Sequence, residues 1–104
     1  MNVAVRDNQN DDRYEIHVDG QLAGFAEYRL RPGKISFPHT EIEPKQAGAG
    51  LGSQLIRFAL DDARSRGLSI VPLCPFVIDY IRRHPDDYLD LVVPAMRNQV
   101  IGES

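Results

Sequence analysis

Two side chains in this 104-residue sequence could do acid–base or nucleophilic chemistry directly, Cys74 and His39. Cys74 precedes Pro75, and proline favours the first position of a helix. A thiol at a helix N-terminus is biased toward thiolate, because free N–H groups and the helix dipole stabilise negative charge. His39 lies in an extended segment, where a neutral imidazole could accept a proton from an ammonium group or from a thiol. Each also has a structural interpretation, since free cysteines are often buried hydrophobes and lone strand histidines are often surface residues.

Two further residues are weaker candidates for proton transfer. Glu41 competes with His39 as a base, because residues two apart share one face of a regular strand. The alternative is that Glu41 is an ordinary solvent-facing carboxylate. Tyr80 follows Phe76 by four residues, which suits core packing on the inner side of a helix. An equally weighted part as a proton donor is implied only by resemblance to a family.

A cluster of glycines, Gly48, Gly50 and Gly52, stands just before an amphipathic segment. The first N–H groups of a helix have no intrahelical partner, and the positive end of the dipole lies beside them, so such a turn can bind phosphate. A P-loop requires a lysine before the Ser or Thr that follows its last glycine, and here Ser53 follows Gly52 directly. The dinucleotide fingerprint has the spacing G-x-G-x-x-G, whereas this sequence has G-x-G-x-G. A tight turn with a purely structural role also remains open.

Hydrophobic periodicity and turn signals define the elements that must position these residues. Asp19-Gly20 is a favoured two-residue hairpin turn, and Pro38 implies an edge, a bulge or a splayed position in its strand. Apolar residues at 51, 55, 58, 59 and 63 have helical spacing, and Gly67 can cap the C-terminus of that helix. The predicted elements are strands at 14–18, 22–30 and 35–44, a helix at 51–66, a strand at 68–74 buried on both faces, and a helix that starts at Pro75.

This order predicts an α+β fold in which a mostly antiparallel, mixed sheet packs with two main helices. Residues 22, 24, 26, 28 and 30 are expected on one face of the second strand. The strand–helix–strand segment around the glycines is expected to be one right-handed crossover. Residues 13–93 form the expected domain, residues 1–12 a flexible N-terminal lead, and residues 94–104 a loosely held tail.

Composition excludes several functional classes. The formal net charge is −3 and the twelve Lys and Arg residues are scattered, which does not favour a nucleic-acid partner. One cysteine cannot form an intramolecular disulfide or a cysteine-based zinc site, and we expect no metal. No apolar run approaches the ~20 residues of a membrane span, and the N-terminus does not read as a signal peptide. We therefore expect a cytoplasmic protein, and a monomer because no apolar stripe is left unexplained.

Three motifs together resemble a known family. They are the glycine loop of residues 43–52, the His-Thr-Glu sequence at 39–41, and the Cys-Pro-Phe-Val segment at 74–77 that leads to His84-Pro85. The loop resembles the acyl-coenzyme A pyrophosphate loop of GNAT-type N-acetyltransferases, Gln/Arg-x-x-Gly-x-Gly/Ala, with Ala47 at the Gln/Arg position. The combination, from about Tyr14 to Val92, is similar to a small stand-alone acetyltransferase-like family with a minimal GNAT fold.

The resemblance implies binding of acetyl-coenzyme A and transfer of its acetyl group to an amine. The acceptor could be a protein or peptide amine or a small molecule, and the alternative is a coenzyme A-binding module with little or no catalytic activity. The catalytic residues implied are His39, Cys74 and Tyr80. The implied coenzyme-binding residues are Ile42, Gln46, Ala47, Gly48, Ala49, Gly50, Leu51, Gly52 and Ser53.

Two chemical routes are compatible with these residues. In direct transfer the amine attacks the thioester, His39 or water takes its proton, and Cys74 or Tyr80 protonates the leaving thiolate. In the covalent route Cys74 first accepts the acetyl group and then passes it on. Direct transfer is the usual GNAT route and is the one we expect.

Overall fold

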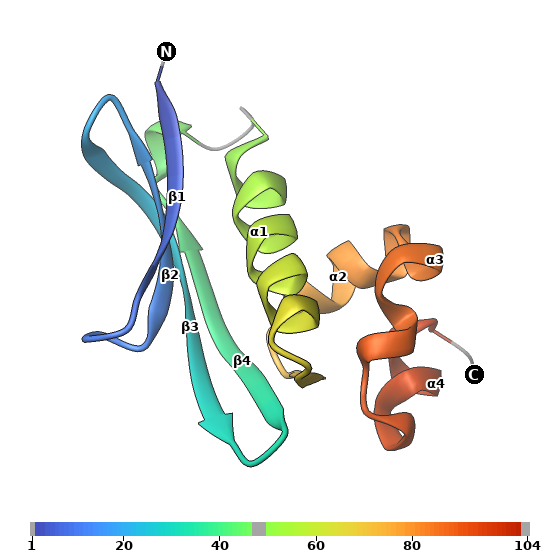
Figure 1. Cartoon of the computed structure of the whole chain (residues 1–104). Coiled ribbons are helices and arrows are strands. Elements are labelled where there is room, and N and C mark those ends of the chain that lie inside the picture. The colour runs from blue at the N-terminus through green and yellow to red at the C-terminus, as the bar shows by residue number, and fades with distance from the viewer. Residues whose placement is uncertain (1, 47–49, 103–104) are drawn as a thin grey trace.

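The computed structural model describes residues 2–46 and 50–102, which form one sheet with helices packed against one side of it (Figure 1). The strands are β1 (Val3–Asn8), β2 (Arg13–Val18), β3 (Gln21–Arg31), β4 (Lys34–Ile42) and β5 (Ser69–Pro72). The α-helices are α1 (Leu51–Ser65), α2 (Pro75–Arg83), α3 (Pro85–Tyr88) and α4 (Arg97–Val100). Three 3-10 helices are η1 (Pro44–Gln46), η2 (Leu89–Leu91) and η3 (Pro94–Met96).

The sheet has the strand order β1-β2-β3-β4-β5. The first four strands pair antiparallel in sequence, and β5 pairs parallel with β4 after the crossover through α1. This confirms the predicted α+β class with a mixed, mostly antiparallel sheet. No helix in the described ranges is both long and apolar enough to cross a membrane.

Helix α1 supplies much of the core because one of its faces is continuously apolar. Leu55, Ile56, Ala59 and Leu60 are fully buried against the sheet. Phe58 was expected on this buried face but is 40% exposed, since it lies at the margin of the face. Gly67 follows the helix at φ +70°, as predicted for a C-terminal cap, and the Leu68 amide closes the cap on the Ala63 carbonyl.

The β2–β3 hairpin has the predicted turn, with positive φ at both Asp19 and Gly20. The prediction of a single apolar face on β3 is wrong at its ends. A register shift between Ile16 and His17 changes the alternation at the start of β3, so Ala23 is buried and Leu22 is 44% exposed. Leu30, at the other end of β3, is also exposed.

Both chain ends are more ordered in structure than the sequence indicated. Residues 3–8, expected as part of a flexible lead, form edge strand β1, because Val3 and Val5 alternate toward the core and pair with β2. In the expected loose tail, Val100 is fully buried, and the Arg82 guanidinium donates to its carbonyl at 2.7 Å. Strand β5 is shorter than the predicted 68–74, and only alternate residues in it, Ile70 and Pro72, are buried.

Asp7 tests whether β1 is an integral strand. Its carboxylate accepts a hydrogen bond from the Tyr28 hydroxyl at 2.7 Å and lies 3.6 Å from the Arg66 guanidinium. We expect Asp7→Ala to lower the free energy of unfolding by about 1–2 kcal/mol in urea titrations. Asp11→Ala, at an exposed turn position, is the control and should change it by less than about 0.5 kcal/mol. If Asp7→Ala and Asp11→Ala both change the free energy of unfolding negligibly, the segment of β1 is a flexible lead after all.

Candidate functional site

The site is organised by the point at which β4 and β5 stop pairing. The last register pair joins Phe37 to Pro72, the final residue of β5. The Phe37 carbonyl then accepts the amides of Leu73 and Cys74, at 3.3 and 2.9 Å. Beyond this point β4 continues to Ile42 while the chain after β5 turns into α2. The two strands therefore diverge, and the sequence-based expectation of a splayed strand at Pro38 is confirmed.

A β-bulge at the same place reverses which residues of β4 face the helices. Glu27 pairs with His39 but Arg29 pairs with Ser36, so one residue of β3 opposes two of β4. After the bulge, Thr40 pairs with the core-facing Ala26. Directly opposed residues share a face of the sheet, so Thr40 lies on the helix side and His39 on the open side.

The edge of β4 beyond the bulge has backbone groups that no described strand pairs with. The Glu43 amide donates to the Ala23 carbonyl of β3 at 2.7 Å. Backbone groups alternate in direction along an antiparallel strand, so those of Thr40 and Ile42 point away from β3, toward the gap left by β5. An extended ligand chain with amide groups could pair with this edge as an extra strand would.

On the open face, His39 is held by its neighbours. Its Nε2 lies 2.9 Å from Oε1 of Glu41, and its ring lies edge-on to Phe25 with 6.1 Å between centroids. The two residues share a face, as predicted, and Glu41 is a hydrogen-bond partner of His39. A carboxylate only accepts hydrogen bonds, so a neutral imidazole in this pair would carry its proton on Nε2 and leave Nδ1 as the accepting atom.

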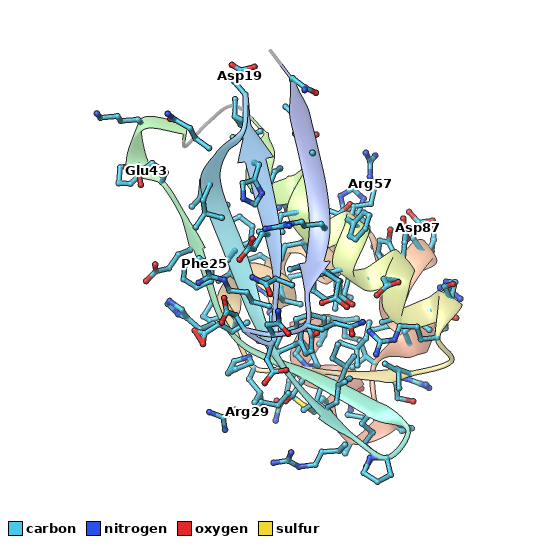
Figure 2. All side chains as sticks on the ribbon, turned by 60° about the vertical axis from the view of Figure 1, so that its left-hand side comes forward. Asp19, Phe25, Arg29, Glu43, Arg57 and Asp87 are labelled. Carbon is cyan, nitrogen blue, oxygen red and sulfur yellow. The ribbon has the colours of Figure 1, made fainter. Side chains whose placement is uncertain are left out.

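Phe25 in turn is fixed by a buried carboxylate network. Arg13 lies over the Phe25 ring at 4.5 Å from its centroid and donates to Glu15 at 2.8 Å. Burial alone would raise the pKa of the Glu15 carboxyl, but hydrogen bonds from Asn8, Arg13 and Arg6 outweigh it and hold the pKa below its ordinary value. An ionised Glu15 with three hydrogen-bond donors therefore orders the face on which the histidine stands. Figure 2 shows this face in front, with Phe25 labelled.

Cys74 is the N-cap residue of α2 and is 6% exposed. Its carbonyl accepts the amides of Val77 and Ile78, and Pro75 occupies the first helical position, as predicted. Because its amide binds Phe37, it stands at the apex of the gap, two strand residues or roughly 7 Å along β4 from His39. Cys74 and His39 thus stand on the two elements that diverge at the gap.

The N-terminus of α1 has the features of an anion site. Gly50 is the N-cap at φ +75°, no side-chain cap bond is present among the described residues, and no residue of the first turn is acidic. The amides of Leu51, Gly52 and Ser53 precede the first intrahelical donor, Gln54, which bonds Gly50. Of the other residues in the coenzyme-binding prediction, Gln46 ends η1, and Ala47, Gly48 and Ala49 lie outside the described residues.

Gly52 has a structural reason that its place in a glycine loop did not reveal. A Cβ on Gly52 would come within 2.9 Å of Cε1 of Phe76, and closer still to its Cζ. The ring of Phe76, 38% exposed, therefore lies against the first turn of α1 and forms a wall beside it. The spacing of Phe76 from Tyr80 had indicated a place on the inner side of its helix, so its half-exposed ring, which packs against α1, is a correction.

Tyr80 lies among the helices. Its ring is 5% exposed and packs on His84 and Tyr88, with centroid separations of 4.4 and 5.8 Å. Burial raises the pKa of Tyr80, so its phenol remains protonated at neutral pH. The packing expected for Tyr80 is therefore present, and its part in proton donation stays a prediction.

A cavity of about 380 Å³ opens beside His39 at the end of the sheet. It is lined by residues 22–25 at the start of β3 and 41–44 at the end of β4. The Glu41 and Glu43 carboxylates make its rim acidic, and Figure 2 shows Glu43 and Phe25 along the same margin of the sheet. The cavity can admit a small cationic group.

Residues 13–91 match the family model described as GCN5-related N-acetyl-transferase. The chain belongs to this family. The match runs from the start of β2 to η2 and so includes the β4–β5 divergence, the N-terminus of α1 and the start of α2.

Individual relatives support the same placement. Streptothricin acetyltransferase of Streptomyces lavendulae is 39% identical over 54 residues, which are 50% of this chain and 29% of that protein. A ribosomal-protein-alanine N-acetyltransferase structure from Brucella melitensis superposes with a TM-score of 0.52 at 23% identity, over 78% of this chain and 61% of that one.

A Neisseria gonorrhoeae N-acetylglutamate synthase complexed with coenzyme A and N-acetyl-glutamate superposes with a TM-score of 0.55 at 15% identity, over 98% of this chain and 27% of that one. At these identities the two structures show the shared fold. The chain spans less than two-thirds of the length of each of these relatives.

Sequence reasoning missed Phe25, Thr40 and Gly24 as parts of the site. Phe25 is an aromatic residue among polar ones on the open face, and that exception was a readable signal. Gly24 lies inside a strand, which often marks a close backbone approach. A Cβ there would come within 2.7 Å of the Glu41 carbonyl, so glycine lets β3 and β4 close beside the cavity.

The contact between Gly52 and Phe76 gives a double-mutant test. We expect Gly52→Ala to destabilise the protein, although alanine favours a helix by about 1 kcal/mol. In a Phe76→Leu background the same change should become neutral or stabilising, with a coupling energy of about 1 kcal/mol or more in urea unfolding. If the two substitutions are instead additive, the ring does not set the need for glycine.

Proposed function

We propose that this chain is an acetyl-coenzyme A-dependent N-acetyltransferase that acts on an amine. The observation that carries the proposal is the divergence of β4 from β5 at Phe37, with a proton acceptor on one side and a buried thiol at the apex. Family membership supports the reaction type, and the acceptor is inferred from the site alone.

The residues present fit the coenzyme. The uncapped amides of Leu51, Gly52 and Ser53 would hold its diphosphate, because a helix N-terminus without acidic residues favours an anion. The backbone groups of Thr40 and Ile42 would hold its amide-containing arm in the gap between the strands. When bound, the coenzyme supplies an acetyl thioester, which is activated for transfer to a nucleophile.

His39 would take the proton from the acceptor ammonium. Its Nε2–H points to Glu41, which fixes the tautomer and leaves Nδ1 as the accepting atom. The carboxylate also stabilises the imidazolium that proton transfer produces. On the α2 side, Cys74 and the protonated phenol of Tyr80 are the two groups that can give a proton to the leaving group.

The acceptor would approach across the open face of the sheet. The cavity beside His39 has carboxylates of Glu41 and Glu43 at its rim, which favour a cationic amine over a neutral one. The helices cover the other face, so this side is an open surface and not an enclosed pocket (Figure 1). Such a surface suits a protein or peptide amine better than a small metabolite that needs walls around it.

The same openness favours a second candidate, a coenzyme A-binding module without efficient catalysis. Fewer walls mean weaker positioning of the acceptor and a smaller rate gain. Binding with no acetylation of any amine in a panel of peptides, polyamines and amino acids would support this second function.

The role of His39 is tested by separating binding from turnover. We expect His39→Ala to lower kcat by about 10²–10⁴-fold, because a positioned base contributes that much. Its Kd for acetyl-coenzyme A by titration calorimetry should stay within about twofold, since the imidazole does not hold the coenzyme. Arg29→Ala changes an exposed side chain of β3 on the same face and should leave both values unchanged.

Millimolar acetyl-coenzyme A that shows no binding to the wild-type chain would remove both candidate functions. A His39→Ala variant with normal kcat would remove only the assignment of the base.

Direct transfer and a cysteine intermediate differ in one observable. Cys74 is buried at the end of a strand, where an added acetyl group would need space that a 6% exposed side chain does not have. We expect intact-mass spectrometry after mixing with acetyl-coenzyme A alone to show no stoichiometric adduct on Cys74. An adduct that forms and is consumed as fast as turnover would establish the covalent route.

A further inference from the structure

Thr40 carries a buried hydroxyl that no described residue satisfies. Its Oγ1 is shielded from solvent and has no hydrogen-bond partner among the residues that the structure describes. It is the only threonine in the sequence. Leaving a hydroxyl unpaired in this way costs about 1–3 kcal/mol, so buried polar atoms without a partner are uncommon and require an explanation.

The residue opposite Thr40 on the neighbouring strand offers no hydrogen-bond partner for its hydroxyl. Across the sheet it faces Ala26, a fully buried residue with no polar side-chain atom. Valine has the same shape and a higher tolerance for apolar surroundings, so it would suit the folded protein better than threonine. The hydroxyl is thus a cost to the free protein, and a ligand that pairs with it would remove that cost.

The place of Thr40 indicates which ligand group that is. The residue follows the bulge, next to His39 in sequence, and its own backbone groups point into the gap where β4 and β5 diverge. Its side chain lies on the helix side of the sheet, opposite the open face that carries the imidazole. The hydroxyl therefore borders the gap from the side on which α1 and α2 begin.

We propose that the Thr40 hydroxyl donates a hydrogen bond to a carbonyl oxygen of the acyl-pantetheine arm. This inference rests on the proposed function, because it requires the coenzyme in the gap. The arm offers two kinds of carbonyl, its amides and its thioester, and both are acceptors that match a hydroxyl donor. A bond to the thioester would hold the acetyl group in the gap between the strands, and Thr40 then becomes a substrate-contacting residue of the site.

Thr40→Val provides a test in which stability and binding move in opposite directions. Without ligand we expect its melting temperature to rise by about 4 °C or more, because the unpaired hydroxyl is gone. Its Kd for acetyl-coenzyme A by calorimetry should rise about tenfold, because one buried hydrogen bond is lost. A role in packing alone cannot give this pair of results.

Thr40→Ser is the matched variant, since it keeps the hydroxyl and loses the methyl group. It should bind acetyl-coenzyme A like the wild type and melt at a lower temperature. Free coenzyme A separates the two acceptors: equal weakening for both ligands in Thr40→Val assigns the bond to an amide carbonyl, and weakening for acetyl-coenzyme A alone assigns it to the thioester.

The inference is overturned if Thr40→Val binds both ligands with wild-type affinity, or if it melts below the wild type without ligand, as it would if the hydroxyl were already paired. Failure of the wild-type chain to bind acetyl-coenzyme A is a different result, which removes the proposed function and the inference with it.

Discussion

Two prolines determine where the central sheet opens. Pro72 ends β5 opposite Phe37, and Pro38 follows Phe37 in β4. Proline has no amide hydrogen, so neither can extend a ladder at its own position. Pairing therefore ends at Phe37, whose carbonyl turns to the amides that lead into α2. The positions of His39, Thr40 and Cys74 all follow from that end point.

The bulge that accompanies the opening determines which face of the sheet each of residues 39–41 occupies. Without it, residues 39 and 41 would continue the inward series of Ile35 and Phe37, and the histidine would be buried against the helices. With the extra residue, His39 and Glu41 emerge on the open face and Thr40 turns inward. In the proposed function this register presents the base on the acceptor side and the hydroxyl on the coenzyme side, whereas a regular strand would exchange the two faces.

Four features could be predicted from local signals in the sequence. They are the fold class, helix α1 with its glycine cap, the β2–β3 turn at Asp19-Gly20, and the irregularity at Pro38. Each depends on a period or on the φ preference of one residue. The edge strand at 3–8, the buried Val100 and the role of Gly52 could not be predicted in this way. They depend on contacts between distant segments, such as Phe76 with the first turn of α1, which no local pattern encodes.

Charge pairing across the strands stabilises the open face of the sheet, since the helices pack on the other face. Glu15 accepts hydrogen bonds from three side chains of β1 and β2 while only 3% exposed, and Arg13 links it to Phe25. Single ion pairs on an exposed sheet face normally contribute little to the stability of a protein. Here the carboxylate is buried and fully paired, so removing any one partner leaves part of a buried charge unsatisfied. The network therefore links β1, β2 and Phe25 and supports the histidine, although no described helix packs over them.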